Sequence, residues 1–127
     1  MTDFPESHRD LLDAPVAVLS TVGSTGIPHS TVVWFLYDEG EVKLWLSSER
    51  QKTKNLLERP ECSLLILDTA NTFRYLSVRG RAELVPDPDL VLGDKFSAKY
   101  GVDVRTMMND TEIRYAITIH PTQVLSQ

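Results

Sequence analysis

The sequence is poor in the residues on which several classes of protein depend. Cys62 is the single cysteine, so an intrachain disulfide and a cysteine-based metal cluster are both excluded. The three histidines have no spacing typical of metal ligands, and we expect no metal site. No apolar run approaches the roughly 20 residues that a membrane-spanning helix needs. The first residues show neither the basic nor the apolar segment of a secretory signal, so we expect a cytoplasmic protein with no membrane partner.

Positive charge is scarce as well. Lys and Arg total 13 against 18 Asp and Glu, which gives a formal net charge of −5. A surface that binds nucleic acid or anionic lipid favours an excess of Lys and Arg. The composition therefore argues against nucleic acid as a partner, although it is compatible with a small local basic site.

The chain is the size of one domain. It has 127 residues, of which 42% are apolar, and no repeat or linker divides it, so we expect a single domain over residues 1–127. A domain of this size buries only about two-thirds of its unfolded surface, so it cannot easily enclose a large pocket alone. Association with a second copy would be one remedy.

Stretches rich in β-branched and aromatic residues predict a mainly β protein. Six strands are expected, at residues 16–22, 28–37, 41–46, 61–67, 73–85 and 114–120, and the first three predict an antiparallel meander. Helices are expected at residues 5–13, 49–58 and 88–100, with a further helical turn at 103–108. Gly80 interrupts the apolar face of the fifth strand and predicts a bulge or a close backbone approach. This pattern favours a small closed barrel of antiparallel strands with short flanking helices, and an open α+β sheet is the alternative.

The segment from Ser47 to Asn55 is the most informative part of the chain. Ser48 and Gln51 have the spacing of a capping box, which would place serines at a helix start. Arg50 and Lys52 fall in the first turn, where cations oppose the helix dipole. A bound phosphate would reverse this penalty, because it would receive backbone N–H groups, serine hydroxyls and two cations together. The alternative is that these charges form the solvated face of a surface helix.

No set of side chains in the sequence forms a recognisable catalytic group. There is no G-x-S-x-G elbow, P-loop or G-x-G-x-x-G fingerprint, and carboxylate pairs such as Asp87 and Asp89 are typical of helix caps. The catalytic residues therefore stay unknown, and an enzyme built on this chain would depend on a cofactor for its reactive centre. The aromatic residues of most interest, which are more typical of packing than of a ligand platform, are Trp34, Trp45, Phe73 and Tyr75.

Several blocks of the chain, taken in order, resemble the flavin/deazaflavin oxidoreductase superfamily, the split β-barrel proteins related to pyridoxamine 5′-phosphate oxidase. They are Val18-Leu-Ser-Thr with Gly26-Ile-Pro-His-Ser, Thr31-Val-Val-Trp34, Arg50-Gln-Lys-Thr-Lys-Asn-Leu56, Arg59-Pro60 and Val78-Arg-Gly-Arg-Ala-Glu83. The resemblance runs from about Val16 to Val124 and is closest to the branch that uses the deazaflavin coenzyme F420. It implies a six-stranded antiparallel FMN-binding split barrel.

The resemblance also implies where a cofactor and a partner would bind. The family's phosphate-binding block would place Arg50, Lys52 and Asn55 on the cofactor phosphate. The remaining residues implied around the cofactor are Ser47, Ser48, Gln51 and Lys54 near the phosphate, and Thr31, Val33 and Trp34 beside the isoalloxazine-type ring. The family forms homodimers with two cofactor sites at the interface, and the second subunit would contribute residues around Phe73, Tyr75 and Arg79.

The function implied by the resemblance is an F420-dependent reductase that transfers a hydride from the reduced deazaflavin to an electron-poor small molecule. An FMN-dependent oxidoreductase on the same fold, or a non-catalytic protein that binds a flavin or tetrapyrrole, are the alternatives. Pyridoxamine 5′-phosphate oxidases carry a C-terminal segment with an arginine that helps to recognise their substrate. This sequence ends on Val124-Leu-Ser-Gln127, so we do not expect that particular activity.

Overall fold

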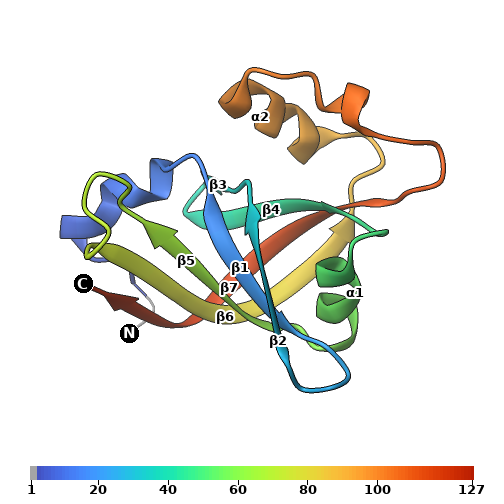
Figure 1. Cartoon of the computed structure of the whole chain (residues 1–127). Coiled ribbons are helices and arrows are strands. Elements are labelled where there is room, and N and C mark those ends of the chain that lie inside the picture. The colour runs from blue at the N-terminus through green and yellow to red at the C-terminus, as the bar shows by residue number, and fades with distance from the viewer. Residues whose placement is uncertain (1–2) are drawn as a thin grey trace.

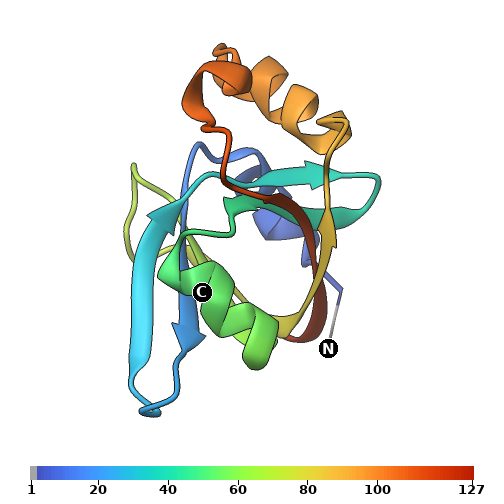
Figure 2. The same cartoon turned by 90° about the vertical axis from the view of Figure 1, so that its right-hand side faces the viewer.

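The computed structural model describes residues 3–127, which form one antiparallel sheet with short helices around it (Figure 1). The strands are β1 (Ala17–Val22), β2 (Pro28–Val33), β3 (Leu36–Asp38), β4 (Glu41–Ser47), β5 (Glu61–Leu67), β6 (Tyr75–Pro86) and β7 (Arg114–Ser126). The helices are η1 (Glu6–Asp13) and η2 (Val104–Met107), both of the 3-10 type, and α1 (Gln51–Glu58) and α2 (Val91–Tyr100). The strand order is β2-β1-β5-β6-β7-β4-β3, and the sheet curls into a barrel (Figure 2). The mainly β barrel expected from the sequence is confirmed.

The structure has seven strands where six were expected, because the predicted strand at residues 28–37 is two strands. Its first part, β2, pairs with β1, and its last part, β3, pairs with β4. The ladder breaks at Trp34 and Phe35, whose side chains pack into two different clusters. β2 and β3 are therefore consecutive in the chain but form the two opposite edges of the sheet. The predicted three-stranded meander is wrong for this reason.

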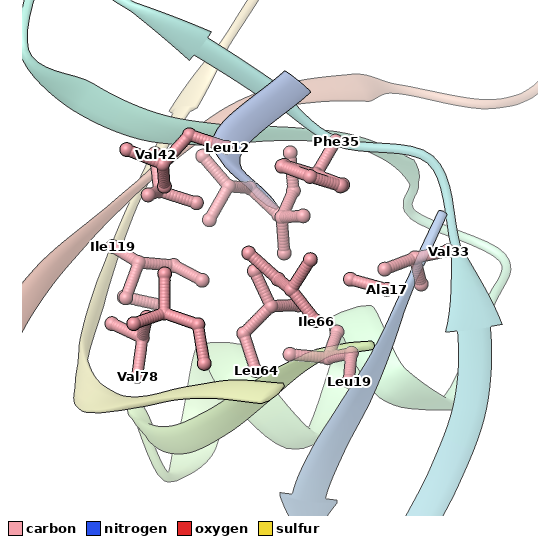
Figure 3. Close-up of a cluster of buried hydrophobic side chains, with 14 of the residues drawn as sticks. Leu12, Ala17, Leu19, Val33, Phe35, Val42, Leu64, Ile66, Val78 and Ile119 are labelled. Carbon is pink, nitrogen blue, oxygen red and sulfur yellow. The ribbon is translucent and has the colours of Figure 1, made fainter. Parts of the chain in front are cut away.

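A hydrophobic core fills the barrel (Figure 3). Alternate residues of β1, β5 and β6 point inward, as Leu64 of β5 does opposite Val78 of β6, and both of these are fully buried. Leu11 and Leu12 of η1 and Leu56 of α1 join the same core from opposite sides of the barrel. The inside of the barrel is thus occupied by side chains, and a ligand must bind outside it.

A second, smaller cluster lies between α2, η2 and the outer side of β4. Trp45 is its centre, and its indole N–H donates to Asp87 at 3.0 Å. Asp87 also accepts the N–H groups of Val91 and Gly93, each at 3.0 Å, so it caps α2 although the helix begins three residues later than the sequence predicted. A Cβ at Gly93 would lie 2.8 Å from the Trp45 ring, which explains a glycine inside this helix.

Two long strands, β6 and β7, form the spine of the sheet, and β7 extends to Ser126, well beyond its predicted end. A bulge occurs between Arg79 and Gly80, where a Cβ on Gly80 would lie 2.5 Å from the His120 carbonyl oxygen, so the prediction at Gly80 is confirmed. Cys62 is half-buried in β5, also as predicted.

The loop between β5 and β6 is tied to η1 by one arginine. The guanidinium of Arg74 pairs with Asp10 at 2.6 Å and with Asp68 at 3.1 Å. The hydrogen bond from Arg74 lowers the pKa of Asp10, and the backbone N–H of Ala70, followed by Arg74, lowers that of Asp68. None of the helices in residues 3–127 has the length and apolar character to cross a membrane.

Candidate functional site

A cleft of about 460 Å³ opens where the ends of β2 and β4 meet the start of α1. Helices α2 and η2 form its far wall. Its lining residues are Val32, Val33, Trp34, Trp45, Leu46, Ser47, Arg50, Lys52, Phe96, Val104, Met107 and Arg114. Five of the sequence-predicted site residues are thus together here: Val33, Trp34, Ser47, Arg50 and Lys52.

One end of the cleft carries unneutralised positive charge. Arg50 is the N-cap of α1 and Lys52 lies in its first turn, and no carboxylate within residues 3–127 forms an ion pair with either. The backbone N–H groups of Gln51 and Lys52 form no hydrogen bond within the same residues. Free N–H groups and cations at a helix start are donors of the kind that bind phosphate.

Lys52 is held in place rather than extended into solvent. Its ammonium donates to the hydroxyl of Thr31 on β2 at 3.0 Å. Burial, together with the neighbouring charge of Arg50, lowers the pKa of Lys52 below its ordinary value. The ammonium is therefore less stable here than in water, and an anion in the cleft would stabilise it.

The predicted capping box is wrong, because both serine hydroxyls bond to the segment that precedes β7, at Glu112 and Ile113. Ser48 Oγ accepts the backbone N–H of Ile113 at 2.9 Å, and α1 has no side-chain cap. Ser47 Oγ accepts the N–H of Glu49 and donates to the Glu112 carboxylate at 2.5 Å. Of these two serines, only Ser47 lines the cleft.

Arg114 is a cationic cleft residue that the sequence did not reveal. It stands opposite Ser47 in the ladder between β4 and β7, and its guanidinium carbon lies 4.5 Å from the centre of the Trp45 ring. Its Nε donates to Glu112 at 2.9 Å. Burial opposes the ionisation of Glu112, but the hydrogen bonds from Ser47 and Arg114 outweigh it and lower the pKa. The result is a neutral Ser47–Glu112–Arg114 network beside the two free cations.

Asn55, Gln51 and Lys54 lie away from the cleft. The side chain of Asn55 is buried, donates to Thr21 at 3.0 Å and accepts from Gln51 at 2.8 Å, so it joins α1 to β1. Lys54 is exposed and does not line the cleft. These contacts are structural ones, and a role for the three residues in phosphate binding stays a prediction.

The other end of the cleft is aromatic and apolar. Trp34 stacks on Tyr100 of α2 with ring centres 4.0 Å apart, and Trp45 stacks on Phe96 at 6.5 Å. Val104 and the half-exposed Met107 complete this wall. Phe96, Val104 and Met107 were also missed, since nothing in the local sequence places α2 and η2 over β4.

Comparison with known proteins fixes the family. Residues 4–127 match the family model described as pyridoxamine 5′-phosphate oxidase. The chain belongs to this family. A solved F420 reductase is 31% identical, with 98% of this chain and 100% of that chain covered and a TM-score of 0.86. The search of curated proteins gives no match.

Two further solved structures with this fold have names that describe different functions or none. A conserved hypothetical protein from Mycobacterium tuberculosis is 27% identical, with coverage of 98% and 85% of the two chains and a TM-score of 0.79. The heme storage protein HutZ from Vibrio cholerae is 17% identical over 99% and 95% of the two chains, with a TM-score of 0.76. At that identity the likeness to HutZ shows the fold alone.

The three residues that the family resemblance assigns to a second subunit lie outside the cleft of their own chain. Tyr75 begins β6 and pairs with Leu67, and Arg79 is exposed on the outer face of β6, where it donates to Gln123 at 3.2 Å. Neither residue lines the cleft. The exposed Phe73 precedes them in the loop between β5 and β6. A role for Phe73, Tyr75 and Arg79 in a cofactor site therefore stays a prediction.

Proposed function

We propose that this protein is an F420-dependent reductase that binds the reduced deazaflavin in the cleft beside α1 and passes its hydride to an electron-poor small molecule. The observation that carries the proposal is a pair of cations, Arg50 and Lys52, that have no carboxylate partner within residues 3–127 and lie at one end of a cleft whose other end is aromatic and apolar. The family includes flavin- and F420-binding oxidoreductases, and the 31% identity to an F420 reductase over the whole chain supports the choice.

The two ends of the cleft suit the two parts of such a cofactor. A phosphate needs cations and N–H donors, and Arg50, Lys52 and the free N–H groups of α1 provide them. A planar ring needs a flat, dry wall, and Val33 and Trp34 at the end of β2 provide one. The bound deazaflavin would supply the hydride chemistry, since no side chain here is a candidate for it.

The protein's own contribution is then positioning and the exclusion of water. The phosphate contacts would fix one end of the cofactor, while the wall formed by Trp34, Phe96 and Val104 would hold the ring and the substrate in one orientation. Fixing two reactants in a productive orientation can supply several kcal/mol of the barrier reduction, on the order of 7–11 kcal/mol in the most favourable systems.

We further propose that the protein is a homodimer with its cofactor sites at the interface. The outward side chains of β1, β2, β5 and β6 stay half-buried or exposed, and Val18, Val32 and Leu65 give this face an apolar character. Val32 both lines the cleft and is 63% exposed, so a partner on this face would also close one wall of the cleft. Light scattering should give the mass of a dimer, and Leu65→Asp should give a monomer that binds cofactor weakly.

Parallel fluorescence titrations with coenzyme F420 and with FMN test the proposed function. We expect tighter binding of F420, and turnover when reduced F420 is offered with a panel of enones and quinones. FMN binding that is tenfold tighter would favour the FMN-dependent alternative and overturn the choice of cofactor. Tight binding of F420 without turnover on any acceptor would instead indicate a non-catalytic carrier.

A further inference from the structure

The peptide at the break between β2 and β3 is held by two side chains from the end of α2. The ladder of β2 ends at Val33 and that of β3 begins at Leu36, so Phe35 lies in neither. Its N–H donates to the Tyr100 hydroxyl oxygen at 3.0 Å, and its carbonyl oxygen accepts from the Lys99 ammonium at 2.8 Å. Both backbone groups of Phe35 therefore find their partners in α2.

The same two residues also reach the chain that follows η1. Lys99 donates to the carbonyl oxygen of Ala14 at 2.8 Å, and the Tyr100 hydroxyl donates to that of Pro15 at 2.6 Å. The Lys99 ammonium lies 4.1 Å from the centre of the Phe35 ring. Lys99 and Tyr100, here called the α2 clamp, thus join three segments that are far apart in the chain.

The clamp acts next to a wall of the cleft. Trp34, which lines the cleft, precedes Phe35 and stacks on the Tyr100 ring with an angle of 5° between the planes. Phe35 points into the barrel core and is fully buried, while Trp34 packs on the α2 side. Because a free peptide at a strand break can rotate, the orientation of Trp34 depends on what holds Phe35.

We propose that Lys99 and Tyr100 are positioning residues that fix the Trp34–Phe35 peptide and thereby set the ring-binding wall of the cleft. This inference rests on the proposed function for the identity of the ligand. An unpartnered buried N–H is costly, and the Tyr100 hydroxyl removes that cost for Phe35 while its ring covers one face of Trp34. The clamp would therefore pre-organise the cleft before a ligand binds, which reduces the ordering that binding requires.

The test uses Tyr100→Phe, which removes the hydroxyl and keeps the ring. The amide of Phe35 should exchange its hydrogen at least about fivefold faster, as expected for a buried donor that loses its acceptor. The near-ultraviolet circular dichroism of Trp34, identified by subtracting the spectrum of Trp34→Phe, should weaken. The Kd for coenzyme F420 should rise at least about threefold, and the double variant Lys99→Met/Tyr100→Phe should show a larger rise.

Lys95→Met is the matched control, because Lys95 also ties α2 to the sheet, through Asp38 at 2.6 Å, but touches neither Trp34 nor Phe35. It should leave the Phe35 exchange rate, the Trp34 signal and the Kd unchanged. The proposed role of the α2 clamp would be wrong if Tyr100→Phe left both the hydrogen exchange of the Phe35 amide and the circular dichroism of Trp34 unchanged. It would also be wrong if these two signals changed while the Kd for F420 did not. A wild-type protein that fails to bind F420 would overturn the proposed function instead, while the ligand-free measurements would still decide whether the clamp holds the peptide.

Discussion

Replacement of Lys52 by methionine separates a binding role from a structural one. The side chain keeps its aliphatic stem and loses the charge that lies beside Arg50 without an ionic partner in residues 3–127. A charge-assisted hydrogen bond to a phosphate contributes about 1.5–3 kcal/mol, so Lys52→Met should weaken the binding of F420 by a factor of about 10–150.

The same substitution should cost the free protein little. The lost hydrogen bond to Thr31 is worth about 1 kcal/mol. Against this, burial and Arg50 place the pKa of Lys52 below its ordinary 10.5, so the folded state disfavours the ammonium. That penalty is fully present at pH values below the lowered pKa and disappears as the pH rises toward 10.5, so at pH 7 its removal stabilises the variant. The net change in the free energy of unfolding should stay within about 1 kcal/mol.

The assay is a fluorescence titration with F420 at two salt concentrations, combined with urea unfolding of the free protein. Arg59→Met is the matched control, since it removes the same charge at the far end of α1, where Arg59 pairs with Glu58 at 3.1 Å. It should change the affinity by less than about twofold. An unchanged Kd in Lys52→Met, or a loss of stability above about 2 kcal/mol without a change in affinity, would refute the phosphate-site assignment.

Three further predictions concern the fold. Gly93→Ala should destabilise the protein by about 1–3 kcal/mol and alter the fluorescence of Trp45, because the new Cβ would lie 2.8 Å from the Trp45 ring. Urea unfolding curves of the wild type and the variant would check this. Arg74→Met should be less stable than the wild type above pH 4. The difference should shrink as the pH falls through the lowered pKa values of Asp10 and Asp68, because protonation removes the charges that Arg74 binds. Urea unfolding at several pH values would measure this trend. Cys62 should react slowly with a disulfide reagent at pH 8, with a rate that rises toward pH 11, because burial raises the pKa of its thiol to about 11.

Much of the barrel could be predicted because its signals are local. The alternation of buried residues along β6 follows from a side-chain period of two, and it is visible in the sequence. The bulge at Gly80 could also be predicted locally, because only glycine tolerates the close approach of the His120 carbonyl. The basic start of α1 was also a local signal, since Arg50 and Lys52 oppose the dipole of their own helix.

The features that escaped prediction depend on contacts between distant parts of the chain. Residues 28–37 have a continuous β propensity, and the break after Val33 is stabilised by Tyr100, which lies 65 positions after Phe35. Arg114 enters the cleft because the register of β4 and β7 places it opposite Ser47. The predicted capping box was wrong for the same reason, because the backbone N–H of Ile113, which precedes β7, donates to the Ser48 hydroxyl oxygen. Neither a register nor a tertiary hydrogen bond is encoded in local propensity.

The position of the cleft follows from the packing of the barrel. Because the core side chains fill the interior, the cleft lies at the rim, where β2 and β3, the two edge strands, separate at Trp34. Several unfavourable features gather at this rim, namely a broken ladder, two adjacent cations and a helix start with free N–H groups. The two adjacent cations cost the free protein some stability, and a ligand that carries an anion would offset that cost. Substitutions at Arg50 or Lys52 that stabilise the free protein should therefore be easy to find and should weaken the binding of F420. Substitutions at Lys95 that stabilise the protein should leave the binding of F420 unchanged.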